Sequence, residues 1–174
     1  MNAMVLVILL ALLPLAVAAG SVATAVDPAA VGDGADRSDA EFLQAMLADA
    51  EEEVEAALAA LRRPLPEAER SLATQMLSLG ETMERELRTL ARERGLAPGD
   101  PDPRRGEARE RAGDSFADAY LHGRIEALER LAARCHAIHA ASDDPEVLAF
   151  AALHLPDLLR RLDVAQRRLT AAGG

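Results

Sequence analysis

Apolar side chains recur every three or four residues in four separate stretches of this chain, at about residues 39–61, 66–94, 115–141 and 145–170. This spacing places them on one face of an α-helix, whereas a strand would alternate apolar and polar residues. Leu, Ala, Val and Met fill most of these positions, and aromatic residues make up only 2% of the chain. Strands favour β-branched and aromatic residues instead. The pattern therefore predicts an all-α protein with four helices.

Residues that start and stop helices stand at the ends of these stretches. Ser38 and Glu41 have the spacing of a capping box, in which the two side chains satisfy free backbone N–H groups of the first turn. Pro66 and Pro145 suit the first turns of the second and fourth helices, and Gly95 suits the end of the second. The first helix is therefore expected to begin directly after the capping serine.

The third helix has a clear inward-facing stripe with one misfit. Its apolar face is predicted to consist of Phe116, Tyr120, Ala127, Leu128, Leu131, Cys135 and Ile138. Arg124 projects onto the middle of this face, and a buried guanidinium requires a carboxylate or carbonyl partner. Glu84, at the edge of the apolar face of the second helix, is the predicted partner. The alternative is that Arg124 reaches solvent at one end of the bundle.

The two halves of this region are alike. Phenylalanine, alanine and two glutamates recur at one constant offset, as Phe42, Ala45, Glu52 and Glu55 in the first half and as Phe116, Ala119, Glu126 and Glu129 in the second. Each half is then one helical hairpin that cannot bury its apolar stripe alone. The simplest arrangement pairs the two hairpins into a four-helix bundle over residues 38–171.

The N-terminal residues form an apolar run, at about positions 4–19, that is typical of a secretory signal. Small residues at Ala16-Val17-Ala18 and at Ala23-Thr24-Ala25 fit a cleavage site. A membrane span needs about 20 apolar residues, and this run is shorter and contains a proline. We therefore expect a signal peptide at residues 1–25, a flexible leader at 26–37 and a periplasmic location. The alternative is an uncleaved anchor that faces the periplasm.

Charge and motifs exclude several classes of function. The net charge of −10 argues against nucleic-acid binding, because an acidic surface repels the phosphate backbone. The sequence has no Gly-rich phosphate loop, no nucleophile elbow and no Cys-x-x-Cys pair. We therefore expect that the protein is not an enzyme and takes no cofactor.

Cys135 and His139 are the candidate metal ligands, because side chains one helical turn apart can share a soft ion such as Zn(II) or Cu(I). The alternative is a buried thiol beside a boundary histidine, since Cys135 projects near the centre of the apolar face and His139 near its edge. The four repeated glutamates form two Glu-x-x-Glu pairs. They project away from the apolar stripes and are expected to be solvated.

Three segments resemble domain-of-unknown-function family 4142: SDAEFLQ…EVE at residues 38–55, GDSFADAY at 113–120, and DPEVLAFA at 144–151 with the Leu155-Pro156 that follows. The resemblance covers about residues 38–169. It implies an exported protein, often labelled a predicted outer-membrane protein, with a ferritin-like four-helix bundle. The family has no settled biochemical role, so the resemblance implies a fold and a location rather than a reaction.

The chain also departs from the pattern of that family. Its members tend to carry a histidine late in helix two, one before a glutamate in helix three and one after the Leu-Pro of helix four. These positions correspond here to Gly80, Leu128 and Arg161. The resemblance therefore implies that this chain has lost any metal site built on those histidines.

These observations together predict a non-enzymatic, exported helical-bundle protein of the periplasm or envelope. Its partner is expected to be another protein or an envelope component, and it would touch the membrane only through an uncleaved N-terminal segment. The alternative is a ferritin-like metal-binding protein that uses Cys135 and His139.

Overall fold

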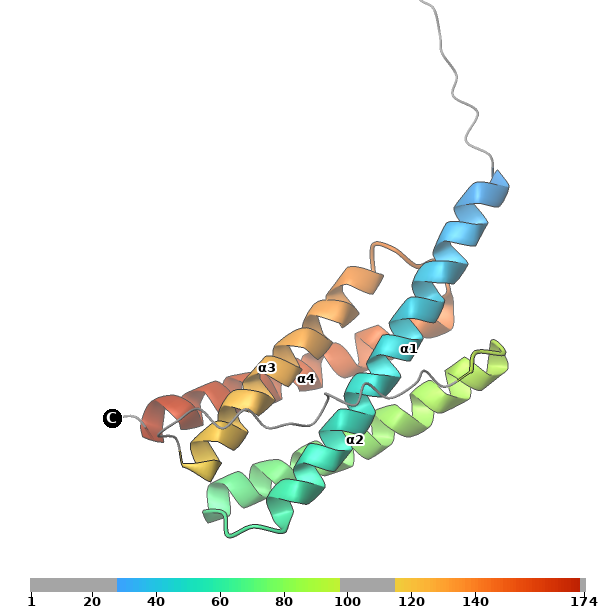
Figure 1. Cartoon of the computed structure of the whole chain (residues 1–174). Coiled ribbons are helices and arrows are strands. Elements are labelled where there is room, and N and C mark those ends of the chain that lie inside the picture. The colour runs from blue at the N-terminus through green and yellow to red at the C-terminus, as the bar shows by residue number, and fades with distance from the viewer. Residues whose placement is uncertain (1–27, 98–114, 173–174) are drawn as a thin grey trace, which may run out of the picture.

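The structure is a computed structural model that describes residues 28–97 and 115–172. It contains the helices α1 (Pro28–Leu61), α2 (Glu67–Glu93), α3 (Phe116–Ile138) and α4 (Pro145–Ala172), and no strand occurs within the described ranges (Figure 1). The all-α prediction is confirmed. The predicted signal peptide at residues 1–25 lies outside the described residues.

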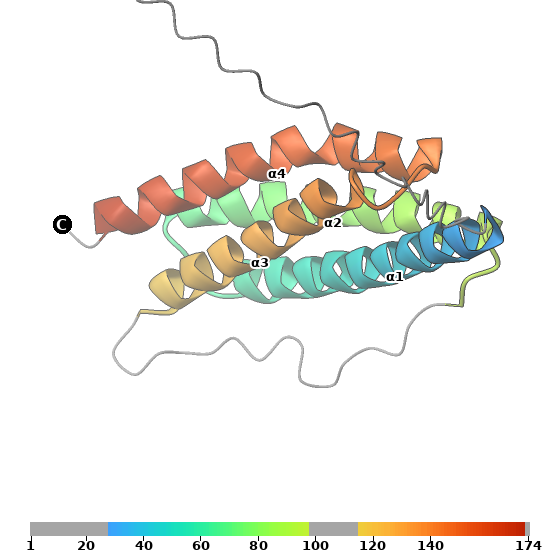
Figure 2. The same ribbon diagram turned by 90° about the horizontal axis from the view of Figure 1, so that it is seen from above.

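The four helices pair as two antiparallel hairpins, α1 with α2 and α3 with α4 (Figure 1). The hairpins meet mainly where α1 packs on α3, while α2 and α4 approach each other more sparsely. Seen from above in Figure 2, the helices form one bundle with α1 and α4 on opposite sides of it. The four-helix bundle of two hairpins is therefore confirmed.

The core of the bundle consists of leucine, methionine and alanine side chains from all four helices. The largest apolar side chains that are fully buried are Leu43, Met46, Leu72, Met76, Met83, Leu87, Leu121, Leu128, Leu131, Val147 and Leu158. Burial of each such side chain contributes about 1.5–3 kcal/mol. The inward faces that the 3.6-residue period predicts are those that meet in this core.

The start of α1 differs from the prediction. The helix begins at Pro28, so residues 28–37, which were expected to form a flexible leader, are helical, and Ser38 lies inside the helix rather than at its cap. Extending an existing helix adds one hydrogen bond per ordered residue without a new nucleation step. Pro28 suits the first helical position, because its missing N–H would have no partner there. Propagation from the packed part of α1 therefore outweighs the local capping signal.

The other helix ends lie close to their predicted positions. Pro66 precedes α2, and Gly95, with φ at 66°, follows the α2 C-cap in a left-handed conformation that glycine adopts at low cost. Ser115 caps α3 by accepting a hydrogen bond from the N–H of Asp118 at 3.2 Å. α3 ends at Ile138, three residues before the predicted end, and α4 continues through Pro156.

Gly80 shows how closely α1 and α2 pack. A Cβ atom at this position would lie 2.9 Å from Cγ2 of Val54 and 3.4 Å from the carbonyl oxygen of Ala50. The histidine that the family resemblance implies at this position would therefore not fit without separating the two helices. Glycine at position 80 allows the close contact between α1 and α2.

Within the described residues, none of the four helices combines the length and apolarity that crossing a membrane requires.

Candidate functional site

An ion pair with both partners buried lies where α1 packs on α3. Nη1 of Arg124 in α3 donates a short hydrogen bond to Oε2 of Glu53 in α1, and the side chains are only 8% and 2% exposed. Burial by itself would lower the pKa of Arg124, but the charge and hydrogen bond of Glu53 outweigh it and raise that pKa above its usual value. The guanidinium is therefore a permanent cation whose charge is balanced inside the bundle.

Tyr120 completes this cluster. Its ring centroid lies 5.5 Å from Cζ of Arg124, and burial raises the pKa of its hydroxyl, so the group is neutral. Oη of Tyr120, Oε1 of Glu53 and Nε of Arg124 have no hydrogen-bond partner among the described residues. Each such buried polar atom costs about 1–3 kcal/mol. The arrangement suits holding α1 and α3 in one relative position rather than reacting with a substrate.

The predicted partner of Arg124 was wrong. Glu84 instead pairs with Arg88 on the surface of α2, with 2.7 Å between Oε1 and Nη1. The sequence reasoning missed Glu53, although it follows Met46 and Ala50 at helical spacing and therefore lies on the inward face of α1. The pair could have been predicted from one signal, namely that Glu53 lies on the apolar stripe of one helix and Arg124 on that of another.

The structure places the two predicted metal ligands in different environments. Cys135 is completely buried in the core, and burial raises the pKa of its thiol to about 11. His139 is the C-cap residue of α3 and is exposed. Thiolate, not thiol, binds metal ions, so burial works against Cys135 as a ligand. In the described part of the chain, no three His, Cys, Asp or Glu side chains are grouped so that they could hold a metal ion.

The repeated glutamates lie mostly in solvent. Glu55, Glu126 and Glu129 are exposed, as predicted. Glu52 is half-buried and faces Arg130 across the contact of α1 with α3, with 3.4 Å between Oε2 and Nη2. The four carboxylates therefore do not point together into the bundle.

His154 forms another polar contact from a buried position. Its Nε2 lies 2.6 Å from Oε2 of Glu86, which links α4 to α2. The ring lies 4.5 Å from that of Phe150, and Phe150 meets the ring of Phe42 edge-on at 6.3 Å. His154 is thus a buried residue that links α4 to α2, and its neighbour Phe150 packs against α1.

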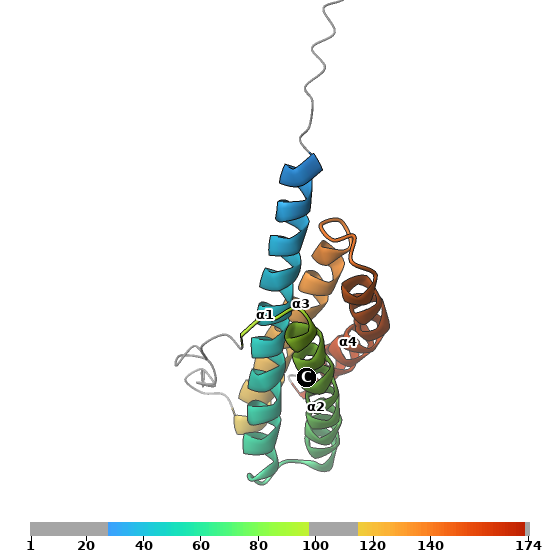
Figure 3. The same ribbon diagram turned by 90° about the vertical axis from the view of Figure 1, so that its right-hand side faces the viewer.

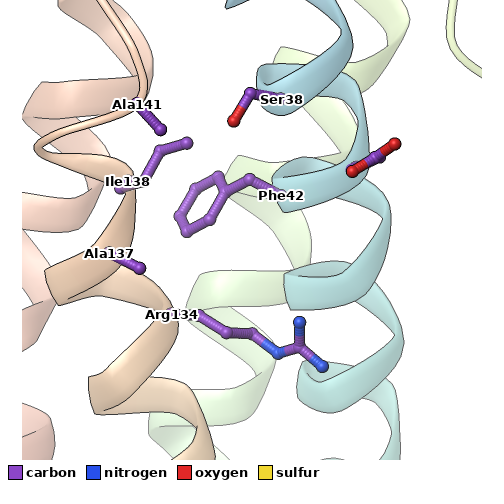
Figure 4. Close-up of a pocket in the computed structure, with 7 residues that line it drawn as sticks. Ser38, Phe42, Arg134, Ala137, Ile138 and Ala141 are labelled. Carbon is purple, nitrogen blue, oxygen red and sulfur yellow. The ribbon is translucent and has the colours of Figure 1, made fainter.

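An open groove runs between the first part of α1 and the end of α3 (Figure 4). Its volume is about 290 Å³, and it is lined by Ser38, Glu41, Phe42, Arg134, Ala137, Ile138 and Ala141. In Figure 4, Phe42 and Ile138 point toward each other from the two helices. Nε of Arg134 donates to Oδ2 of Asp49 at 2.9 Å, so the guanidinium that lines the groove already has a partner. The groove is a shallow, mainly apolar surface feature.

Comparison with known proteins identifies relatives of this fold. Residues 24–167 match the family model described as domain of unknown function DUF4142. The match begins well before residue 38, in agreement with the early start of α1. No protein among the curated sequences matches. A crystal structure of a DUF305 fragment from Deinococcus radiodurans aligns with a TM-score of 0.63 and 20% identity, over 77% of this chain and 96% of that one. At this identity the likeness shows a shared fold.

Proposed function

This chain belongs to the family of the domain of unknown function DUF4142, and from that premise we propose that it is an exported, non-enzymatic protein of the cell envelope. Its helical bundle acts through its surface, on a partner in the periplasm or envelope. Its membrane contact is limited to the N-terminal segment before cleavage.

The N-terminal apolar run is the observation that carries this proposal. It occupies about positions 4–19, and small residues suited to signal cleavage follow it. The family match starts at residue 24, close to the second cleavage candidate. A cleavable signal peptide followed by a folded domain is the arrangement expected of an exported protein.

The arrangement of chemical groups supports an action through the surface. The buried charges of Arg124 and Glu53 balance each other, and the thiol of Cys135 is completely buried in the core. Catalysis needs a reactive group that a substrate can reach with a base, acid or metal beside it. In the described residues, the most reactive side chain and the buried charges are both shielded from solvent.

Fractionation of cells that express the full chain tests the proposal. N-terminal sequencing of the periplasmic protein should begin at Ala19 or Val26, after one of the two cleavage candidates. Leu9→Arg places a charge inside the apolar run and should keep the chain in the cytoplasm with Met1 intact. Recovery of the wild-type chain in the cytoplasm, or in the membrane pellet with Met1 intact, would overturn the proposal of a cleaved, exported protein.

A further inference from the structure

The outward face of α4 is apolar over three turns. All residues of α4 that are exposed between Glu146 and Arg160 are apolar, and they are Ala149, Ala152, Leu153, Pro156 and Leu159, here called the α4 stripe. Leu153 and Leu159 are 66% and 49% exposed, which makes them the most exposed large apolar side chains of the described residues. Figure 3 shows α4 at the outer edge of the bundle.

The α4 stripe has the geometry of a helix contact. At 100° per residue, its five members fall within about 120° of the helix circumference and extend over about 15 Å of its length. Alanine at positions 149 and 152 leaves room for close approach of another helix, and Leu153 and Leu159 flank this low centre. One face of this width is what a helix buries against a neighbour.

α4 already buries another face in its own bundle. Val147, Phe150, Ala151, Leu158 and Ala165 are all buried against the other helices. A helix that is apolar on two sides is typical of a helix that is covered on two sides. The α4 stripe therefore lacks a covering partner among residues 28–97 and 115–172, and its occupant must come from elsewhere.

The charges at the two ends of the stripe identify that occupant. Glu146 and Arg160 each lie seven residues from Leu153 and carry opposite charges. Seven residues make two turns to within about 20°, so both charges lie on the same side of the helix as Leu153. In an antiparallel pair of α4 helices whose two-fold axis lies level with Leu153 along the helix, Glu146 of each copy lies opposite Arg160 of the other, at the edge of the stripe.

We propose that the α4 stripe is the interface of a homodimer, in which two copies pack antiparallel through α4. Such an interface is self-complementary, because a two-fold axis repeats each contact. Glu146 and Arg160 have partners within the chain, Arg94 and Asp157, yet their side chains remain 63% and 70% exposed. Both can therefore reach a second copy. This inference does not depend on export.

A lipid surface fits the stripe less well. Interfacial helices bind membranes through apolar burial together with attraction to anionic headgroups. The net charge of −10 gives repulsion instead. The paired opposite charges at the stripe ends also match a second copy better than a surface of one sign.

The dependence of molar mass on concentration, measured by analytical ultracentrifugation, tests the dimer. The wild-type chain should convert from monomer to dimer as its concentration rises. Leu153→Glu buries a carboxylate at the axis and should raise the dimer dissociation constant by at least about tenfold. Ser78→Glu, on the outward face of α2, is the matched control and should leave it unchanged. A monomer at every soluble concentration, or equal effects of both variants, would overturn the proposal.

Charge exchange tests the orientation of the two copies. Glu146→Arg and Arg160→Glu should each weaken self-association, because each homodimer then juxtaposes like charges. An equimolar mixture of the two variants should form heterodimers, since both cross-contacts again join Arg to Glu. Misfolded variants could not recover association on mixing. Failure of the mixture to recover would overturn the antiparallel pairing.

Co-sedimentation with vesicles of phosphatidylcholine and phosphatidylglycerol covers the lipid alternative. The wild-type chain should remain in the supernatant. Binding that Leu153→Glu abolishes would assign the stripe to a lipid surface and overturn the homodimer.

Discussion

The outward faces of α2 and α4 differ sharply, although each of the two helices buries an apolar face in the core of the bundle. Between Ala73 and Glu93, the exposed residues of α2 are all polar or charged, and they are Thr74, Gln75, Ser78, Glu81, Arg85, Arg88, Thr89 and Arg92. The corresponding face of α4 is apolar from Ala149 to Leu159. Folding of the bundle requires one apolar face per helix, and both helices have it. The difference is therefore not required for folding. It supports the proposal that α4 is the helix that contacts a second copy of the chain.

The two helices are also tied to each other by polar side chains rather than by a wide apolar contact. His154 contacts Glu86 at 2.6 Å, Arg161 donates to Gln75 at 3.3 Å, and Arg94 donates from Nε to Asp144 at 3.1 Å. Arg161 occupies one of the positions where the family resemblance implies a histidine. Its polar link to α2 gives that position a structural role in this chain.

The outward faces of α2 and α4 can be compared only while the bundle keeps its helix arrangement, and the buried ion pair of Arg124 and Glu53 helps to hold that arrangement. Breaking this pair is expected to have the largest effect on stability. Arg124→Ala leaves the Glu53 carboxylate buried without its partner, which should lower the free energy of unfolding by about 3–5 kcal/mol. Urea unfolding measures this loss. The double variant Glu53→Leu with Arg124→Met should recover most of it, because well-packed apolar pairs replace buried ion pairs at little cost. If the double variant recovers no stability, the ion pair stabilises the fold by more than the balance of its two buried charges.

Truncation of the inward faces should affect α2 and α4 alike. Met76→Ala in α2 and Leu158→Ala in α4 each remove a completely buried side chain and leave a cavity, at a cost of about 2–5 kcal/mol. Thermal and urea unfolding measure both. A small effect at only one position would mean that the two helices do not share the same inward role, and the comparison of their outward faces would lose its basis.

Acid should loosen the link between the end of α2 and the start of α4. Asp144 accepts hydrogen bonds from the N–H of Glu146 at 2.8 Å and from Arg94 at 3.1 Å. Burial opposes its charge, but these bonds outweigh burial and lower its pKa below the ordinary 3.8. The stabilisation is therefore complete above that ordinary value and is lost as the pH falls through the lowered pKa.

Two substitutions distinguish the capping hydrogen bonds of Asp144 from the effect of its negative charge. Asp144→Ala removes both and should cost about 0.5–2 kcal/mol at neutral pH. Asp144→Asn keeps a capping side chain, so it should cost less, and its stability should fall less steeply than that of the wild-type chain below the ordinary pKa. Parallel acid profiles for the wild-type and Asn chains would contradict the assignment of the lowered pKa to Asp144.

The smallest effect on the folded monomer is expected at the α4 stripe itself. Leu153→Glu replaces a side chain that is 66% exposed, so the free energy of unfolding should change by no more than about 0.5 kcal/mol at concentrations where the chain is monomeric. Chemical unfolding of the dilute protein measures it. A large loss would show that Leu153 supports the fold, and the stripe could then not be read as a free surface.

The sequence predicted those parts of the fold that repeat locally. The 3.6-residue period placed Leu131 and Cys135 in the core, and Pro66 and Gly95 lie at the ends of α2 where their backbone preferences put them. The start of α1 was wrong, because the capping signal at Ser38 describes one turn only. Whether that turn begins a helix depends on the residues before it and on the packing behind it.

The contacts between helices could not be predicted in the same way. How α3 packs against the first hairpin decides whether Arg124 meets Glu53 in α1 or Glu84 in α2, and no local pattern encodes that packing. The apolar stripe of α4 could not be predicted as a contact surface for the same reason, because the pattern of one helix does not show which of its faces the neighbouring helices cover. Cys135 is completely buried, whereas His139, the C-cap residue of α3, is exposed, and which part of the α3 face the other helices cover depends on packing that the local pattern does not encode.

Disulfide trapping at the two-fold axis tests most directly whether the outward face of α4 differs in function from that of α2. Leu153→Cys and Ser78→Cys would be compared in a Cys135→Ala background, so that each chain has one thiol. Under mild oxidation of the folded protein, the Leu153→Cys chain should form a covalent dimer rapidly, because the two thiols lie beside the axis. The Ser78→Cys chain should remain monomeric. Equal rates of crosslinking at the two positions would contradict the assignment of α4 as the interface.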